Sequence, residues 1–434
     1  MADNKWDNSS TDGLWSTDAN WSLGTKPDGS DDVIFDATSD TACSIDEAAS
    51  CLSLSMLTGY TSTVSNGANT VAVGTGGGDV DVGTLALGSG KWTVQGDWLL
   101  ADVAATTRDA ASIVELAGTA KTMMFNYNQR HQNIVVSGTY TTVATCYHGG
   151  TLDVTGSLTV NHPYTSGHTT LNGTKIDGTG RIYVSGNITL TAGTWSVAGT
   201  KLLGGTNTLS PGTYTTNMTW RKNWSGAKET KTLVAGTYTI EGNLSIENNH
   251  VTYDFEIDLE TNSADLEVSG DLALVELAVG ATVSFKNATG TGSVTLNGTT
   301  GYDDGGFDAN LGDVIVDDAS DLALEDNMTC DDLTVGKGCA VTGAFLATVG
   351  GDFVINGVNL NESTWNGPDL NVTGTAVAHY TTATDSDASA GTAVTATDNC
   401  TDGTGNTDWN FGGVVVAPTG TLYGPLCGPL AGVI

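Results

Sequence analysis

A cluster of side chains able to bind a ligand lies between positions 220 and 231. It consists of Trp220, Arg221, Lys222, Trp224, Lys228 and Lys231. Aromatic faces stack on sugars or on a partner's side chains, and the cations match an anionic glycan or an acidic protein surface. The cluster therefore predicts a binding patch, with an inserted loop packed on a neighbouring part of the fold as the structural alternative.

Oxygen ligands for a cation are concentrated between positions 302 and 313. The carboxylates are Asp303, Asp304, Asp308 and Asp313, and glycines stand between them. Ca²⁺ prefers carboxylate and carbonyl oxygens on a flexible loop, although this spacing is not that of an EF-hand. Calcium is the one cofactor that the sequence suggests, with a solvated acidic loop as the alternative.

Four potential zinc ligands occur between positions 146 and 168: Cys146, His148, His162 and His168. Neighbouring segments that stack could bring them together, because cysteine and histidine are the ligands that zinc prefers. The spacing matches no standard zinc motif. Exposed turn histidines and a buried thiol explain the same residues.

Catalysis on polysaccharides would need paired carboxylates, or a calcium site beside a basic residue. Acidic pairs are present at Asp303-Asp304, Asp317-Asp318 and Asp331-Asp332, but the chain contains 49 Asp and Glu residues, so a pair is not diagnostic. We assign no catalytic residues and expect a protein that is not an enzyme.

The charge balance restricts the partners. Lys and Arg total 15 against 49 Asp and Glu, which gives a formal net charge of −34. Such a charge opposes binding to phosphate backbones and anionic membranes, so we expect no nucleic acid partner and no membrane insertion. The polar start predicts no secretion signal, so the seven cysteines are expected to be thiols made in a reducing cytoplasm.

Short runs of alternating apolar and polar residues must position these side chains. Examples are Leu152-Asp153-Val154 and Ile182-Tyr183-Val184, and Gly, Asn, Asp, Ser and Thr lie between such runs. This period of two indicates half-buried strands, and no long segment has the apolar spacing of a helix. The chain is predicted to be all-β.

A degenerate repeat joins pairs of these strands at a glycine turn. Its glycines are Gly96, Gly156, Gly186, Gly242, Gly270 and Gly351. Most separations are near multiples of about 28 residues, as in solenoid proteins. We therefore predict a right-handed parallel β-helix with one coil per repeat and these glycines at equivalent corners. A series of separate β-sandwiches is the alternative.

A second phrase, Gly-Thr-aromatic, places Tyr140, Trp195, Tyr214 and Tyr238 directly after turns, where we expect them to stack inside the coils. The expected organisation is an N-terminal cap at 1–58, a parallel β-helix at 59–380, and a C-terminal cap with an apolar attachment tail at 381–434. A solenoid needs such atypical ends to cover its open core.

The N-terminal segment carries a family resemblance. Trp15, Trp21, Gly24 and Pro27, followed by Asp31-Asp32-Val33-Ile34-Phe35-Asp36, resemble the start of β-helical proteins encoded by phages and by bacterial surface-protein genes. Residues 43–61 look like the first coil of the same family. The resemblance implies a fibre, spike or decoration protein, and no catalytic residues come with it.

Together these features predict a non-enzymatic structural protein on the exterior of a phage virion, as a capsid decoration, head fibre, tail fibre or spike. We expect a homotrimer that contacts other virion proteins and host surface glycans, with the apolar tail at the contact. The alternatives are a polysaccharide-degrading lyase or hydrolase on the same scaffold, and a bacterial surface adhesin or filament, which would place the protein on the cell surface.

Overall fold

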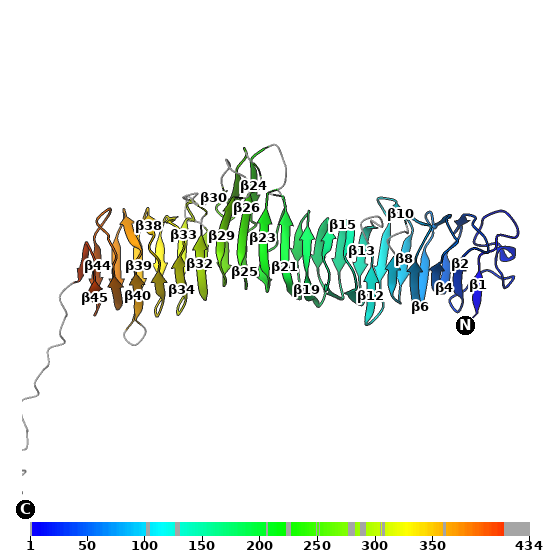
Figure 1. Ribbon diagram of the computed structural model, residues 1–434, viewed down its shortest axis with the longest axis horizontal. Coiled ribbons are helices and arrows are strands. Elements are labelled where there is room, and N and C mark those ends of the chain that lie inside the picture. Colours follow the sequence, from blue (N-terminus) through cyan, green and yellow to red (C-terminus); the bar gives the residue numbers. More distant parts are fainter. Residues whose placement is uncertain are drawn as a thin grey trace, which may run out of the picture.

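The computed structural model describes most of the chain. It covers residues 2–100, 105–125, 131–204, 207–222, 227–248, 250, 252–276, 283–286, 292–303, 305, 309–358 and 362–411. Along these residues parallel coils stack into one long rod, with the N-terminus at one end (Figure 1). The coils make about 17 turns. The prediction of an all-β parallel β-solenoid is confirmed.

Each full coil passes over three faces in a fixed order, and its strands pair in parallel with strands of neighbouring coils. Strands at the first position are β8 (Lys91–Val94), β11 (Ile113–Leu116), β18 (His168–Leu171), β20 (Ile188–Leu190), β24 (Glu229–Thr232), β27 (Phe255–Asp258), β30 (Val283–Lys286), β35 (Met328–Cys330), β38 (Leu346–Val349) and β41 (Asp369–Val372).

The second face follows in the chain. Its strands are β1 (Asp3–Lys5), β2 (Asp32–Phe35), β9 (Trp98–Leu100), β12 (Lys121–Met124), β14 (Thr139–Thr142), β16 (Ser157–Thr159), β22 (Gly212–Tyr214), β25 (Gly236–Ile240), β28 (Ala264–Val268), β31 (Ser293–Leu296), β33 (Asp313–Val316), β36 (Leu333–Val335), β39 (Phe353–Asn356), β42 (Ala376–His379), β44 (Val394–Thr397) and β46 (Trp409–Phe411).

The third face completes the coil. Its strands are β3 (Cys43–Ser44), β5 (Thr63–Ser65), β7 (Thr84–Leu87), β10 (Ala105–Arg108), β17 (Tyr164–Ser166), β23 (Asn217–Arg221), β26 (Leu244–Asn248), β29 (Leu272–Glu276), β32 (Thr299–Asp303), β34 (Asp321–Leu324), β37 (Ala340–Thr342), β40 (Ser363–Asn366), β43 (Thr381–Thr384) and β45 (Thr401–Thr404). Six longer strands run through a corner onto two faces: β4 (Ala49–Met56), β6 (Val71–Val80), β13 (His131–Val136), β15 (Cys146–Val154), β19 (Lys175–Val184) and β21 (Thr194–Leu203).

The alternation seen in the sequence places apolar side chains inside the coils. In β11, Val114 and Leu116 are buried, while Ile113 and Glu115 are only partly covered. The buried residues form one core cluster that extends from Trp6 to Trp409. Burial of apolar surface at about 25 cal/mol per Å² is the main favourable contribution to the stability of such a core.

Coil length varies along the rod. Leu152 pairs with Thr169, 17 residues later, whereas Leu244 pairs with Leu272, 28 residues later. The predicted period of about 28 residues therefore describes only the middle coils. Their extra residues accompany the separate three-stranded sheet β24-β27-β30, which projects from the side of the rod and is called the lateral module below (Figure 1).

The six repeat glycines do not occupy equivalent corners, so this prediction is wrong. Gly96, Gly156 and Gly351 lie between the first and second faces, Gly242 and Gly270 between the second and third, and Gly186 between the third and first. All three corners need tight turns, and the same phrase serves each of them. The corner between the first and second faces instead carries one glycine in each of five successive coils, at Gly118, Gly138, Gly156, Gly173 and Gly193.

The aromatic residues of the Gly-Thr-aromatic phrase do lie inside the coils, as predicted. Tyr140, Tyr214 and Tyr238 are fully buried, and Trp195 is 1% exposed. The rings of Trp195 and Tyr214 lie 6.1 Å apart in a T-shaped arrangement on successive coils. These residues fill the core and are not available to a ligand.

Neither expected domain boundary interrupts the stacking. β1, β2 and β4 already belong to the same sheet as the later coils, and β43 to β46 continue it beyond residue 380. Trp6, Trp15 and Trp21 are buried around the 3₁₀ turn Asp18–Asn20 at the N-terminal end, with Trp21 between the other two rings at 5.1 and 4.7 Å. The rings of Trp6 and Trp21 also pack against Phe35 of β2, each at 6.0 Å.

Two further observations concern the described residues. No helix among the described residues combines the length and the apolar surface that crossing a bilayer requires. The six cysteines in this part of the chain are free thiols, and Cys427 lies outside it.

Candidate functional site

The structure separates the residues of the predicted binding patch. Trp220 lies on β23 with its side chain in the core, fully buried, and its indole N–H points to the Met218 sulfur at 2.9 Å. Arg221 faces outward, because neighbouring residues of a strand point to opposite sides. The expectation that Trp220 offers an exposed stacking surface is wrong, and Trp224 lies outside the described residues.

Two of the predicted cations are also buried. Lys222 donates to the carbonyl of Tyr253 at 2.8 Å and lies 5.2 Å from the centre of its ring. Lys231 donates to the carbonyl of Asn207 at 2.8 Å, and burial lowers its pKa to about 7 against the opposing effect of Glu229. Both lysines therefore support the lateral module from within.

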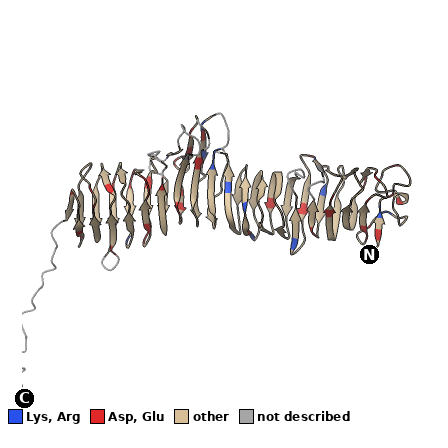
Figure 2. Ribbon diagram, viewed as in Figure 1, with Lys and Arg blue, Asp and Glu red and all other residues tan. Residues whose placement is uncertain are grey.

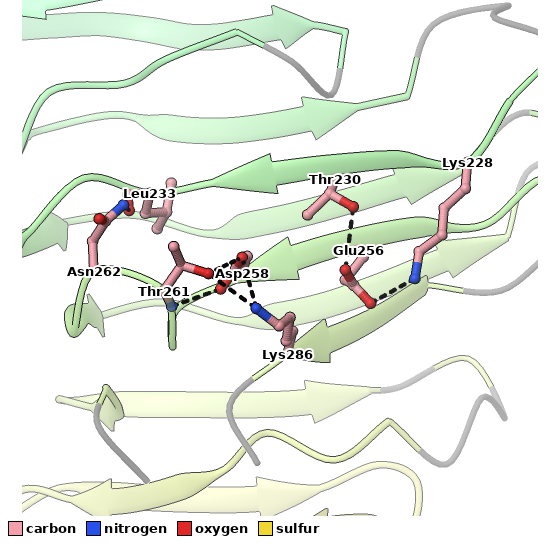
Figure 3. Close-up of polar contacts among 8 residues, drawn as sticks. All are labelled: Lys228, Thr230, Leu233, Glu256, Asp258, Thr261, Asn262 and Lys286. Atoms are coloured by element: carbon pink, nitrogen blue, oxygen red, sulfur yellow. Dashed lines mark hydrogen bonds and ion pairs between the residues drawn. The ribbon is translucent and has the colours of Figure 1, made fainter. Parts of the chain in front are cut away.

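Lys228 remains on the surface of the lateral module (Figure 3). Its ammonium group lies 2.7 Å from Glu256, which also accepts a hydrogen bond from Thr230 at 3.2 Å. These contacts join β24 to β27. Lys228 is thus already paired with a carboxylate of the protein, which weakens its attraction for an external anion.

A second polar cluster ties β27 to β30 (Figure 3). Asp258 accepts hydrogen bonds from the backbone and side chain of Thr261 at 2.9 and 2.6 Å and from Lys286 at 3.2 Å. Burial alone would raise the pKa of Asp258, but these bonds outweigh it and hold the pKa below its ordinary value. The cluster fixes the edge of the lateral module.

Only part of the predicted calcium segment can be placed. Asp303 is exposed at the end of β32, and Asp313 is half-buried at the start of β33. Burial, together with Asp332 and Asp331, raises the pKa of Asp313. Asp304 and Asp308 lie outside the described residues. Within the described part of the chain no group of three or more acidic, histidine or cysteine side chains is arranged to hold a metal ion.

The four potential zinc ligands are not brought together. Cys146 and His148 face the core from β15, whereas His162 and His168 are exposed. In the strand register, His148 lies opposite His131 of the previous coil and not opposite His162 or His168. The zinc hypothesis is wrong in this form, because the two pairs of side chains point to opposite sides of the coil wall.

A groove lined by several charged side chains lies on the third face and is a candidate binding site. It crosses β19, β21, β23 and β26 and encloses about 220 Å³. Its charged and hydroxyl-bearing lining consists of Arg181, Tyr183, Thr200, Lys201, Thr219 and Glu247, with Asn217, Ala198 and Gly199 completing it. Figure 2 shows Lys and Arg positions in this middle part of the rod and Asp and Glu positions along its length.

The charges of this third-face groove have a defined arrangement. Glu247 lies 2.8 Å from Lys201 and 3.5 Å from Arg221, so one carboxylate is shared by two cations. Arg181 is exposed and forms no ion pair with any residue that the structure describes. Its side chain extends over Gly199 of the next coil, where a Cβ would lie 3.4 Å from Arg181 Cγ. The absence of a side chain at Gly199 leaves room for the groove.

Successive coils place outward side chains in columns along this face. One column passes through the groove and consists of Tyr147, Thr165, Tyr183, Lys201, Thr219 and Ser245. Each is half-buried, and its members are separated by the strand spacing of about 4.8 Å. The face therefore presents hydroxyl groups and aromatic rings in a regular line along the rod.

Sequence reasoning missed this groove. Arg181, Lys201 and Glu247 are far apart in the chain, and only the coil register brings them together. Comparison with family models, with curated proteins and with solved structures finds no match for the chain.

Proposed function

We propose that this protein is a non-enzymatic structural component of the exterior of a phage virion, serving as a capsid decoration, head fibre, tail fibre or spike. The observation that carries the proposal is the single core that continues from Trp6 to Trp409 through parallel coils. About 17 turns spaced by about 4.8 Å give a rod about 80 Å long. Such a rod is suited to holding contact surfaces away from a particle.

The virion setting is supported by the resemblance of residues 15–36 to phage-encoded β-helical proteins. The net charge of −34 also suits an exposed particle component. It keeps a long surface soluble and repels nucleic acid released from lysed cells. In this setting the third-face groove is a contact site for host surface glycans.

The non-enzymatic part of the proposal is supported by the groove's own carboxylate. Glu247 is engaged by Lys201 and Arg221 at 2.8 and 3.5 Å, so it acts as their charge partner. A glycosidase would place a second carboxylate about 5–9.5 Å from the first. The groove lining contains a single carboxylate, that of Glu247.

Two experiments test the proposal. Mass spectrometry of purified particles is expected to detect this protein, whereas its recovery from the bacterial cell surface would favour an adhesin or filament. Incubation of the protein with host capsule, lipopolysaccharide or pectin is expected to release no oligosaccharide. Release that a single Asp→Asn or Glu→Gln change abolishes would replace the proposal with a polysaccharide-degrading enzyme.

We also propose a homotrimer, in which the apolar segment 412–434 contacts other copies or another virion protein. This segment lies outside the described residues. An extended apolar segment is suited to burial against a partner. Sedimentation is expected to give a trimer mass for the full chain and a smaller mass for residues 1–411. Equal masses would contradict the role of the segment.

A further inference from the structure

We propose that the third-face groove binds one acidic sugar unit of a polysaccharide, with Arg181 facing its carboxylate. The inference deepens the proposed exterior function and rests on it for its biological setting. The binding itself concerns only the isolated protein and can be measured without particles. The groove-binding inference and the proposed exterior function can therefore be confirmed or contradicted separately.

The charge of the lining favours an anion. Arg181 and Lys201 contribute two positive charges to the groove, and Glu247 contributes one negative charge. This site is thus cationic in a chain whose net charge is −34. Arg181 extends along the groove wall and has no ion-pair partner among the described residues. A guanidinium group binds a carboxylate through two parallel hydrogen bonds, which a neutral sugar cannot accept.

The rest of the lining matches a sugar ring. Tyr183 and Thr219 provide hydroxyl groups, and Asn217 provides an amide. The carboxylate of Glu247 can accept hydrogen bonds from ligand hydroxyls while Lys201 holds it in place at 2.8 Å. The half-buried ring of Tyr183 offers an apolar face against which the C–H groups of a pyranose can pack.

The size and direction of the groove favour one unit of a longer polymer. Its volume of about 220 Å³ is below the ~300–1,000 Å³ typical of pockets for larger small molecules. The column of Tyr147, Thr165, Tyr183 and Lys201 continues along the rod in the strand register. Neighbouring sugar units would then lie along this column, over the coils before β19.

The carboxylate of Glu247 also disfavours ligands whose negative charges are closely spaced. Glu247 lies beside Lys201, so a ligand with closely spaced negative charges would be repelled. The surrounding negative charge adds to this repulsion for nucleic acids. A polysaccharide with one carboxylate per sugar unit places a single charge in the groove, and hydroxyl groups surround it.

The test is calorimetric titration of the full-length protein at low ionic strength. The probes are a tetrasaccharide containing glucuronate, the corresponding glucose tetrasaccharide, acetate and a glutamate-rich peptide. The acidic tetrasaccharide is expected to bind at least about tenfold more tightly than the other three, because a charge-assisted hydrogen bond contributes that much or more. Added salt is expected to weaken the binding.

Arg181→Gln is expected to lower the affinity for the acidic tetrasaccharide by about tenfold or more. Lys121→Gln makes the same change of net charge on β12, away from the groove, and is expected to leave the affinity unchanged. Circular dichroism checks that both variants fold. Equal binding of the neutral tetrasaccharide, acetate or the peptide would overturn the inference. An undiminished affinity of Arg181→Gln would also overturn it.

The outcome separates this inference from the proposed function. Tight, Arg181-dependent binding by a protein that is absent from particles would leave the groove assignment standing and reject the virion role. Detection of the protein in particles without saccharide binding would do the reverse.

Discussion

Trp98 donates its indole N–H to Nε2 of His131 at 3.2 Å, and both side chains are fully buried. In the next coil His148 lies opposite His131 in the strand register and is 3% exposed. Two ionisable side chains thus share the interior of adjacent coils. Burial is the main cause that lowers the pKa of each to about 3, and the nearby Arg108 guanidinium acts in the same direction on both. His148 also lowers the pKa of His131.

This pair predicts acid sensitivity. Between pH 6.5 and about 3 an unfolded histidine binds a proton that the folded one does not, so stability falls as the pH falls through this range. Each histidine contributes up to about 1.4 kcal/mol per pH unit. The double change His131→Gln with His148→Gln is expected to flatten the pH dependence of the urea unfolding midpoint between pH 6.5 and 4.5.

The exposed His162→Gln serves as the control for this prediction and is expected to leave the pH dependence unchanged. An equally steep pH dependence in the double variant would show that the two buried histidines do not govern acid stability.

Buried Lys231 predicts how the folding stability changes with pH above 7. Burial lowers its pKa to about 7, so between pH 7 and about 10.5 the unfolded chain holds a proton that the folded chain has released. Stability is therefore expected to rise with pH in this interval. Lys231→Met is expected to remove this rise, as measured by urea unfolding at pH 7 and 9. The surface residue Lys228 gives the control, because Lys228→Met should preserve the rise.

The close stacking of Gly156 on the previous coil predicts that a larger residue at this position destabilises the fold. A Cβ at Gly156 would overlap the carbonyl oxygen of Gly138 in the coil below. Gly156→Ala is therefore expected to cost about 1–3 kcal/mol, as overpacking does. At Gly29 the nearest atom to a Cβ is Ser50 Oγ at 3.9 Å, so Gly29→Ala is expected to be tolerated. Similar urea midpoints for the two variants would contradict the stacked-corner geometry.

The tryptophan cluster predicts a local effect at one end of the rod. Trp21 is 2% exposed between Trp6 and Trp15, and a Trp→Ala change at such a site costs about 3–5 kcal/mol. Each coil contacts only its neighbours, so Trp21→Ala should lose hydrogen-exchange protection in β1, β2 and β4 while distant coils keep theirs. Leu23→Ala, at a residue 48% exposed, should change little. Uniform loss along the rod would refute the cap role.

The sequence predicted the fold class because strand alternation and glycine turns are local signals. The Gly-Thr-aromatic phrase correctly placed Tyr140 and Trp195 in the core. The assignment of corners failed, because the phrase around Gly186 also occurs at the other two corners. Local sequence specifies a tight turn but not which faces it joins.

The binding residues were harder to predict, because strand phase decides which side chains are exposed. A shift of one residue moves a side chain to the other side of the coil wall, and Trp220 is buried while Arg221 is not. The third-face groove needs the register that places Tyr183 beside Lys201, which depends on coil length. The sequence does not show that length directly.

The most direct test of the account is an electron-microscopy map of the intact particle. The proposed exterior role predicts rod-shaped density about 80 Å long that projects from the capsid or tail and accommodates the stacked coils. Three-fold symmetry of this density would agree with the proposed trimer. A complete exterior map without such a rod, in particles that mass spectrometry shows to lack the protein, would contradict the central claim.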